Sequence, residues 1–229
     1  METITKKIPT TIGIIMDGNR RWARENNLPT LEGHRLGYEK IKELMGWAKE
    51  AGVRNIIVYA FSTENWNRTK DEVAYLMDIF RFMLKKELNR LKQEKIRLRC
   101  IGDLQRFAPD MQKLMAKAEK ETAEADGPTL GVCLSYGGRA EILNAVNEAI
   151  AQGKPVDETS FSKYLWTNVI PDPDIIIRTG GEKRLSGFLT WQSVYSELFF
   201  TKTYWPAFTK KEFMEILEEF ASRDRRNGR

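Results

Sequence analysis

Apolar residues along the chain follow two alternating patterns. Short runs rich in β-branched residues, typical of strands, are separated by stretches whose apolar positions recur with helical spacing. The alternation predicts an α/β fold with strands and helices interleaved along the chain. The predicted strands are residues 11–16, 55–61, 96–101, 129–134, 174–178 and 188–192, and the predicted helices are 33–51, 71–94, 109–125, 139–151 and 210–222.

Several of the predicted strands are apolar throughout rather than at every second position. Residues 56–61 read Ile-Ile-Val-Tyr-Ala-Phe, and residues 174–178 read Asp-Ile-Ile-Ile-Arg. Continuous apolar runs indicate burial on both faces, as in a mostly parallel central sheet flanked by helices. The longest predicted helix, 71–94, has a broad apolar face. Periodicity alone favours packing on the sheet, and a hydrophobic tunnel lined by this helix is the alternative.

Length and charge narrow the classes of function. The 229 residues fit a single domain, 1–229, with residues 1–10 expected to be flexible. Lys and Arg number 37 against 32 Asp and Glu. This mild excess suits anionic ligands or an anionic membrane surface, but is too small to indicate nucleic acid.

The sequence predicts a cytoplasmic protein. The amino terminus lacks the apolar core of a signal peptide, and no run approaches the length that spans a bilayer. Membrane contact is therefore expected only as peripheral contact with the inner face. Cys100 and Cys133 lie within short apolar runs, which is typical of buried reduced thiols. With a single histidine, the chain cannot build the usual zinc sites.

Polar clusters follow the predicted strands directly. They comprise Asp17, residues 62–68, residues 135–139 and residues 178–186. Ligands of open α/β sheets bind beyond the carboxyl ends of the strands. We therefore expect these clusters to converge on one edge of the sheet.

The first cluster lies where the strand 11–16 gives way to a region where a helix can begin. A carboxylate, a glycine and two guanidiniums at such a point can hold a metal ion and a phosphate together. Gly13 and Gly18 have the spacing of the P-loop glycines, but Asn-Arg follows instead of Lys-Ser/Thr, which argues against a standard NTPase. No Gly-x-Gly-x-x-Gly fingerprint is present either. The alternative is an ordinary turn with solvated arginines.

Two further clusters contain candidate phosphate ligands. Residues 62–68 could simply cap the next helix, but Trp66 and Arg68 are not capping residues. Residues 178–186 combine two arginines, two glycines and a serine, which fits a diphosphate clamp. A solvated basic loop is the alternative, and it is weakened because Arg178 closes an apolar strand, where an unpaired charge is costly.

Two single residues have alternative interpretations. Glu197, a lone acid in aromatic surroundings, is either paired with an arginine or a metal ligand. His34, the only histidine, lies at a helix start, where such a residue is more often structural. Beside a diphosphate it could instead donate a hydrogen bond or move a proton.

Several long motifs of the chain resemble the signature segments of cis-prenyltransferases, the undecaprenyl diphosphate synthase family. The resemblance runs in order from about Ile12 to the end, and residues 225–228 resemble the carboxy-terminal Arg-x-Gly of the family. The motifs are Met-Asp-Gly-Asn-Arg-Arg-Trp-Ala, Glu-Gly-His, Tyr-Ala-Phe-Ser-Thr-Glu-Asn-Trp-Asn-Arg, Ser-Tyr-Gly-Gly-Arg, Ile-Arg-Thr-Gly-Gly-Glu-Lys-Arg-Leu-Ser and Trp-Gln-Ser-Val-Tyr-Ser-Glu-Leu-Phe-Phe.

The resemblance implies a homodimeric enzyme that uses Mg²⁺. It would add isopentenyl diphosphate repeatedly, with cis double bonds, to an allylic diphosphate, usually farnesyl diphosphate. The product would be a long polyprenyl diphosphate such as undecaprenyl diphosphate, the lipid carrier for cell-wall synthesis. The growing chain needs an apolar tunnel, which residues 55–61 and 71–94 could line, with the small Ala60 leaving room for a long product.

The same resemblance implies roles for individual residues. Asp17 would be the catalytic carboxylate at the metal, with Glu197 assisting, and Asn65 would help to place the proton that is removed. The Arg-x-Gly end would complete the site of the partner subunit. The residues implied in substrate binding are Gly18, Asn19, Arg20, Arg21, Trp22, His34, Ser62, Thr63, Glu64, Trp66, Arg68, Arg178, Arg184 and Ser186.

The chain departs from the family pattern at two positions. Thr30 stands where the family commonly has an arginine that binds the allylic diphosphate, so the hydroxyl would weaken that binding or shift substrate choice unless Arg24 or Arg35 compensates. Gly187 stands where many relatives have Asn, which loosens a turn.

Three other classes of protein were weighed. A trans-prenyltransferase would carry Asp-Asp-x-x-Asp motifs, and none is present. The non-catalytic partner of a two-component cis-prenyltransferase typically loses the catalytic motifs, whereas Asp17, Asn65 and Arg178 persist. A phosphate-binding regulatory domain would explain the arginines but not the aromatic and apolar lining.

Overall fold

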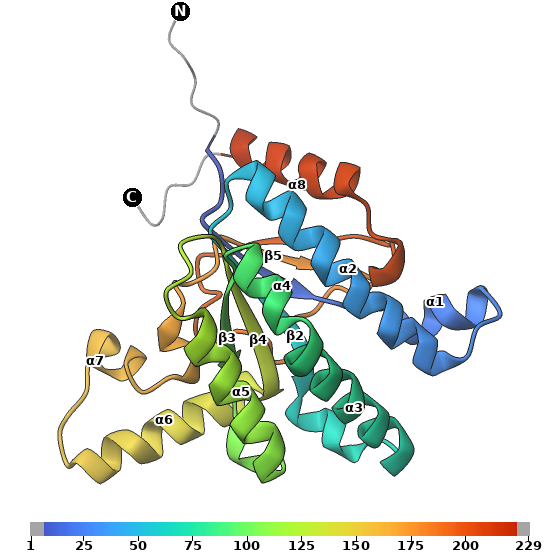
Figure 1. The fold of residues 1–229 in the computed structure, drawn as a ribbon. Helices are drawn as coiled ribbons and strands as arrows, with labels where there is room; N and C mark the ends of the chain where they lie inside the picture. Colours follow the sequence, from blue (N-terminus) through green and yellow to red (C-terminus); the bar gives the residue numbers. More distant parts are fainter. Residues whose placement is uncertain (1–6, 224–229) are drawn as a thin grey trace, which may run out of the picture.

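A six-stranded parallel sheet forms the centre of the molecule, as the sequence predicts. The computed structural model describes residues 7–223 (Figure 1). The strand order is β3-β4-β2-β1-β5-β6, and all five neighbouring pairs are parallel. The strands are β1 (Thr11–Ile15), β2 (Asn55–Ser62), β3 (Arg97–Ile101), β4 (Thr129–Tyr136), β5 (Ile175–Arg178) and β6 (Glu197–Phe200).

Helices cover both faces of the sheet (Figure 1). One face carries the larger core, built with α2, α3, α4, α5 and α8, and the other face carries a smaller core under residues 185–192. The α-helices are α1 (Asn19–Glu25), α2 (Thr30–Ala51), α3 (Lys70–Lys86), α4 (Leu88–Gln93), α5 (Pro109–Thr122), α6 (Gly138–Gln152), α7 (Glu158–Ser162) and α8 (Lys210–Ser222). Short 3-10 turns are η1 (Thr63–Asn67), η2 (Leu104–Arg106), η3 (Trp166–Val169) and η4 (Trp205–Ala207).

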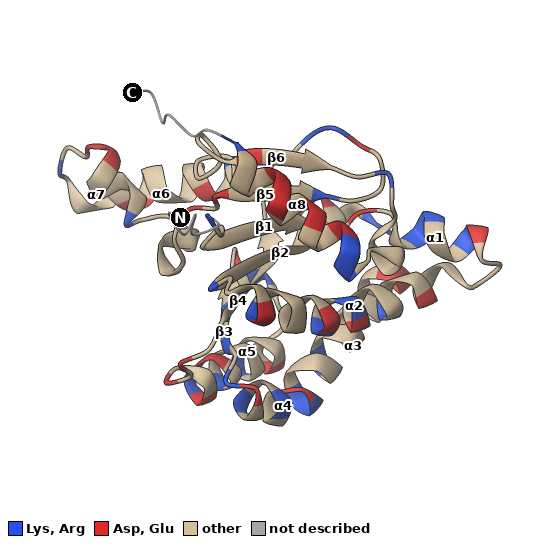
Figure 2. Cartoon of the chain, turned by 90° about the horizontal axis from the view of Figure 1, so that it is seen from above, with Lys and Arg blue, Asp and Glu red and all other residues tan. Residues whose placement is uncertain are grey.

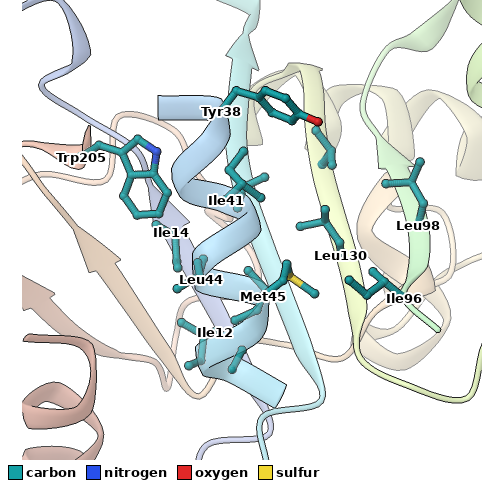
Figure 3. Close-up of a cluster of buried hydrophobic side chains, with 14 of the residues drawn as sticks. Ile12, Ile14, Tyr38, Ile41, Leu44, Met45, Ile96, Leu98, Leu130 and Trp205 are labelled. Atoms are coloured by element: carbon teal, nitrogen blue, oxygen red, sulfur yellow. The ribbon is translucent and has the colours of Figure 1, made fainter. Parts of the chain in front are cut away.

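Helix α2 supplies the centre of the larger core. Its buried positions recur with helical spacing, so they form one stripe that faces the sheet. Figure 3 shows Ile41, Leu44 and Met45 of this stripe beside the strand side chains Ile14 and Leu130. The stripe anchors α2 along the sheet, which fixes the place of His34 near the amino end of the helix.

The predicted strand at residues 188–192 is wrong, and the sixth strand is β6. Phe188 and Leu189 are fully buried, but they lie in a run of turns. The backbone explains this, because Gly187 and Leu189 have positive φ values of 76° and 48°, which no strand accommodates. The Phe188 ring buries itself by stacking on Tyr59, with ring centroids 4.9 Å apart.

The predicted helix 71–94 consists of two helices, α3 and α4, separated at Glu87. The interruption is a single residue without proline or glycine. The Glu87 N–H still donates to the Met83 carbonyl, and the Leu91 N–H donates to the Glu87 carbonyl, both at 2.9 Å. The sequence pattern did not predict α7, a single turn capped by Asp157.

Two cysteines and the chain ends bear on the remaining predictions. Cys100 on β3 and Cys133 on β4 are free, as expected. In residues 7–223 no helix is both long and apolar enough to cross a membrane. Residues 1–6 and the Arg-x-Gly segment at 225–228 lie outside the described residues.

The amide of Thr10 donates to the carboxylate of Asp174 at 2.7 Å, which ties the start of β1 to β5.

Candidate active site

The sheet order places Asp17 at a junction between two halves of the fold. β1 pairs with β2 on one side and with β5 on the other, and the chain runs from β1 to β2 but from β5 to β6, in opposite directions across the sheet. In parallel sheets such a reversal opens a crevice at the carboxyl ends of the strands. Asp17 follows β1 at this crevice, and Gly18 then begins α1 with φ 101°. A side chain at Gly18 would lie 2.5 Å from the ring of Tyr204, so only glycine fits.

The Asp17 carboxylate is held by donors from three directions. Its Oδ1 accepts from the Gly18 amide at 2.7 Å and from Arg21 at 3.2 Å, and its Oδ2 accepts from Arg178 at 2.8 Å. The Asp17 carbonyl accepts from the Thr179 hydroxyl at 2.8 Å. The side chain keeps 29% of its surface exposed, so its position is fixed while it remains open to a ligand.

These contacts set the ionisation of Asp17. Burial alone would raise its pKa, but the hydrogen bond and charge of Arg178, together with Arg21 and the Gly18 amide, bring the pKa below its ordinary value. Asp17 is therefore a carboxylate at neutral pH, as a metal ligand must be.

Arg178 joins two clefts. The residue is 4% exposed, and one guanidinium nitrogen contacts Asp17 while another donates to the Ser186 hydroxyl at 2.9 Å and to the Arg184 carbonyl. Pairing with Asp17 explains how a charge can close the buried strand β5. The predicted convergence of Asp17 with residues 178–186 is thus confirmed.

The first cleft lies beyond β1 and is rich in cations. Its volume is about 390 Å³. It gathers predicted residues from the starts of α1 and α2 and from the end of η1. The lining residues are Met16, Asp17, Gly18, Asn19, Arg20, Arg21, Arg24, His34 and Arg68.

Glu72, in the first turn of α3, contacts three basic groups of this cleft. Its carboxylate lies 2.8 Å from Arg68, 3.3 Å from Arg20 and 3.4 Å from Nε2 of His34. Burial tends to raise the pKa of Glu72, but Arg68 and Arg20 bring it below its ordinary value. Burial and the charge of Arg68 lower the pKa of His34 despite Glu72, so the imidazole is neutral at pH 7.

The second cleft lies on the far side of Arg178. Its volume is about 570 Å³, and its lining includes Thr63, Glu64, Ser186 and the start of α6 at residues 137–140. The amide groups at a helix start favour anions. Ser186 adopts φ 51°, a rare value for a non-glycine residue.

Residues 62–68 are divided between a cap and the core. Ser62 and Asn65 form the cap of η1, in which Oδ1 of Asn65 accepts from the Ser62 amide at 3.1 Å. Trp66 packs edge-on against Phe61 and donates to the hydroxyl of Ser135 at 3.0 Å. Here the capping alternative describes Ser62 and Asn65, whereas Arg68 faces the first cleft.

Seven predicted site residues line neither cleft: Ser62, Asn65, Trp66 and Arg178, whose contacts are given above, and Trp22, Arg184 and Glu197. Trp22 lies on α1 and lines neither cleft, and the Arg184 side chain is 60% exposed and pairs with Glu182. Glu197 begins β6 opposite Ile175, at the end of the strand pair away from Arg178. Its carboxylate pairs with Arg223. Within one chain Glu197 therefore takes no part in the Asp17 site, and the arginine-partner alternative describes it.

The structure indicates which of two arginines, Arg24 or Arg35, could compensate for the arginine that Thr30 replaces. Thr30 is the first residue of α2 and does not line the first cleft. Arg35 pairs with Glu32 at 2.6 Å on the surface. Arg24, by contrast, lines the first cleft, and no carboxylate of residues 7–223 forms an ion pair with it. Of the two compensating residues considered, the structure favours Arg24.

Apolar cavities continue from the first cleft into the core. A cavity of about 60 Å³ shares His34 and Asn19 with the cleft and is also lined by Ala60 and by Phe80 of α3. A second cavity of about 50 Å³ extends between α2, α3 and the sheet, and its lining is overwhelmingly apolar. The face of α3 thus packs on the core and also lines these small cavities, and a tunnel for a growing chain stays a prediction.

Two residues of the site were missed in the sequence. Glu72 lies four positions after Arg68, the helical spacing at which opposite charges pair, and this signal could have found it. Tyr204 packs its ring under the Arg21 guanidinium at 5.3 Å. Nothing in the sequence indicates that contact, because the two residues lie far apart in the chain.

Comparison with known proteins identifies the fold and the family together. A profile of the family described as "Putative undecaprenyl diphosphate synthase" matches residues 15–228. The chain is 43% identical over 227 residues to an isoprenyl transferase of Thermotoga maritima, covering 97% of each chain. It is also 43% identical over 232 residues to the tritrans,polycis-undecaprenyl-diphosphate synthase (geranylgeranyl-diphosphate specific) of Methanopyrus kandleri, covering 97% of this chain and 86% of that one.

Solved structures agree with the sequence relatives. The chain superposes with a TM-score of 0.92 on lavandulyl diphosphate synthase from Lavandula x intermedia in complex with dimethylallyl diphosphate, at 32% identity and with 97% of this chain and 99% of that one covered. A probable undecaprenyl diphosphate synthase from Campylobacter jejuni gives a TM-score of 0.84 at 32% identity, covering 97% and 100%. The chain therefore belongs to the cis-prenyltransferase family and is a prenyl transferase.

Proposed function

We propose that this enzyme condenses isopentenyl diphosphate repeatedly onto an allylic diphosphate, with farnesyl diphosphate as the primer. One observation carries the proposal. A single buried arginine, Arg178, joins the carboxylate of a cation-rich cleft to the serine of a second cleft. Two clefts with anion-binding groups, one of them continuous with apolar cavities, suit a reaction between two diphosphates of which only one carries a long hydrocarbon chain.

The first cleft suits the allylic diphosphate. Four guanidiniums and one imidazole line it, and guanidiniums pair bidentately with phosphate oxygens. Nε2 of His34 is buried, and its contact with the Glu72 carboxylate at 3.4 Å is not a hydrogen bond, so within the described residues it has no hydrogen-bond partner. A phosphate oxygen would satisfy it. In turn, the second cleft suits isopentenyl diphosphate, with Ser186 and the amide groups at the start of α6 as ligands.

The site also fits Mg²⁺. Asp17 offers a half-exposed carboxylate inside a cleft that would hold diphosphate oxygens, and Mg²⁺ is commonly bound by one or two carboxylates together with substrate phosphates and water. Within residues 7–223 no group of three or more His, Cys, Asp or Glu side chains forms a ready-made metal cage. The metal would therefore depend on the substrate for ligands, and it would neutralise charge on the departing diphosphate.

The residues of the two clefts divide the work of the reaction. Cleavage of the bond between the allylic carbon and oxygen places negative charge on the diphosphate, which Arg20, Arg21 and Arg68 would stabilise. The double bond of isopentenyl diphosphate then forms the new carbon–carbon bond, and a proton leaves. Asn65 would help to place that proton, provided that its amide leaves the Ser62 cap when substrate binds.

The product is proposed to be a long chain such as undecaprenyl diphosphate. The two apolar cavities have volumes of about 50 and 60 Å³. One water needs about 10–15 Å³ on the same scale, so each cavity has room for only a few waters. A fifteen-carbon primer does not fit that space. We therefore expect α3 to move away from α2 as the chain grows. Peripheral membrane contact during product release stays a prediction.

The working form is proposed to be a homodimer. Helix α6 exposes an apolar stripe, Leu143, Val146 and Ile150, whose exposed fractions are 64%, 37% and 71%. Residues spaced by three and four lie on one helix face, and a contiguous exposed stripe of this kind is typical of interfaces. Leu143→Lys with Ile150→Lys should convert the dimer to a monomer by analytical ultracentrifugation, and a dimer that persists would exclude this face.

Purified protein tests the activity directly. Incubation with Mg²⁺, farnesyl diphosphate and isopentenyl diphosphate should give polyprenyl diphosphates, and chromatography with authentic cis and trans standards would give their length and geometry. The same reaction with EDTA should stop. Absence of any condensation with farnesyl, geranyl or geranylgeranyl diphosphate would refute the proposed function.

A further inference from the structure

The Glu72 carboxylate forms a hub behind the first cleft. It receives Arg20 from α1, His34 from α2 and Arg68 from the end of η1, so three separate elements meet on one side chain. Its side chain is only 13% exposed. Among residues 7–223, neither Arg20 nor Arg68 forms an ion pair with any other carboxylate. Glu72 is thus the one negative charge that balances this wall of the cleft.

The same three groups are candidate ligands for a diphosphate bound in the first cleft. Arg20, Arg68 and His34 all line the first cleft, whereas Glu72 itself does not. A carboxylate at this point has two opposing consequences. It orders the basic side chains, and it lowers the positive potential that attracts an anion, because like charges repel across a poorly screened site.

We propose that Glu72 is an internal counter-ion that competes with diphosphate for Arg20, Arg68 and His34. The proposal rests on the proposed function, since it assigns a regulation to the same site. Each condensation would leave pyrophosphate in the first cleft, and the elongated product, whose diphosphate came from isopentenyl diphosphate, must then take its place. When Glu72 pairs again with Arg20, Arg68 and His34, these groups bind pyrophosphate less tightly, so release of pyrophosphate is favoured.

The structure offers a matched pair of variants. Glu72→Gln keeps the size and one hydrogen-bond acceptor while removing the charge. Asp71→Asn removes a charge from the neighbouring residue of the same helical turn, where the side chain is exposed and makes no ion pair within residues 7–223. A comparison of the two separates contact with the arginines from a change in net charge.

Calorimetric titration with inorganic pyrophosphate in EDTA is the decisive measurement. Glu72→Gln should bind pyrophosphate about fivefold more tightly than the original chain, or better, and Asp71→Asn should differ by less than about twofold. In turnover, Glu72→Gln should also be inhibited by lower pyrophosphate concentrations. Weaker or unchanged binding by Glu72→Gln, or equal tightening in both variants, would overturn the proposal.

A second measurement needs no variant. Displacement of Glu72 should loosen the first turn of α3, so amide hydrogen exchange of residues 70–73 should become faster when pyrophosphate saturates the original chain. Slower or unchanged exchange would contradict displacement. This failure can be told apart from failure of the proposed function. If the protein makes polyprenyl diphosphate but shows neither the change in pyrophosphate affinity nor the faster exchange, only the proposed role of Glu72 is wrong.

Discussion

The polar clefts and the apolar cavities differ in how far they are prepared for a ligand. The clefts measure about 390 and 570 Å³ and are open, and Arg20, Arg21 and Arg68 of the first cleft are already held by Asp17, Glu72 and Glu182. The apolar cavities of about 50 and 60 Å³ are nearly closed, and Figure 3 shows how closely α2 packs over the strands beside them. Charged groups must be fixed in advance, because reorienting them in the transition state is costly. An apolar wall can open when hydrocarbon arrives.

The largest expected effect comes from the carboxylate of the first cleft. Asp17→Ala should lower kcat by about 10³-fold or more, because it removes the proposed metal ligand and leaves Arg178 buried without its carboxylate partner. Binding of farnesyl diphosphate, measured by calorimetry, should change far less. Asp126→Asn, which removes an exposed partner of Lys95, serves as the control. Near-normal turnover by Asp17→Ala would show that the first cleft is not the catalytic site.

A larger side chain in the apolar cavity tests the other half of the comparison. Ala60→Leu fills part of the cavity next to the cleft, so chain growth should stop earlier and the product should shorten by several isoprene units. The first condensation should proceed at close to its normal rate. Chromatography of the product measures both, and Ala116→Leu on the exposed side of α5 is the matched control. Products of unchanged length would mean that the chain grows elsewhere.

Arg24 tests the compensation for Thr30. Arg24→Ala should raise KM for the allylic diphosphate about tenfold with little change in kcat, because a charge-assisted contact to phosphate contributes about 1.5–3 kcal/mol. Arg35→Ala, which breaks only the surface pair with Glu32, should change KM by less than about twofold. Equal effects of the two substitutions on KM would show that Arg24 does not bind the allylic diphosphate.

The smallest effect concerns pH. The pKa of His34 is lowered, chiefly by burial and then by Arg68, so the unfolded chain takes up the proton first as pH falls below about 6.5. The free energy of unfolding should therefore decline below that pH, and His34→Gln should flatten the part of the decline that begins there. The single imidazole gives an unambiguous NMR titration. A His34 pKa above 6.5 would contradict the structure.

The sequence predicted the regular elements well because their signals are local. Short runs rich in β-branched residues identified β1 to β5, and the polar residues after them identified the edge where the site lies. The signal failed where burial was achieved without a strand, as at Phe188, whose ring stacks on Tyr59. It also failed for Glu197, since only the register of β6 on β5 shows which end of the sheet that carboxylate occupies. Such facts depend on pairing between distant segments.

The charged surface shows the same limit. Lys and Arg are spread over many elements in Figure 2, so their number does not indicate a site. The guanidiniums of the first cleft differ from the others by what surrounds them, namely Asp17, Glu72 and the ring of Tyr204. Sequence spacing alone could have found only the pairs that lie four positions apart, Asp17 with Arg21 and Arg68 with Glu72.

The position of Arg178 between the clefts has a thermodynamic consequence. One guanidinium contacts both Asp17 and Ser186, so a ligand that changes either contact changes the other cleft as well. Binding free energies coupled in this way are reciprocal: if the first diphosphate alters the affinity for the second by some factor, the second alters the affinity for the first by the same factor. The cooperativity between the two substrates is thus a property that one buried side chain can set.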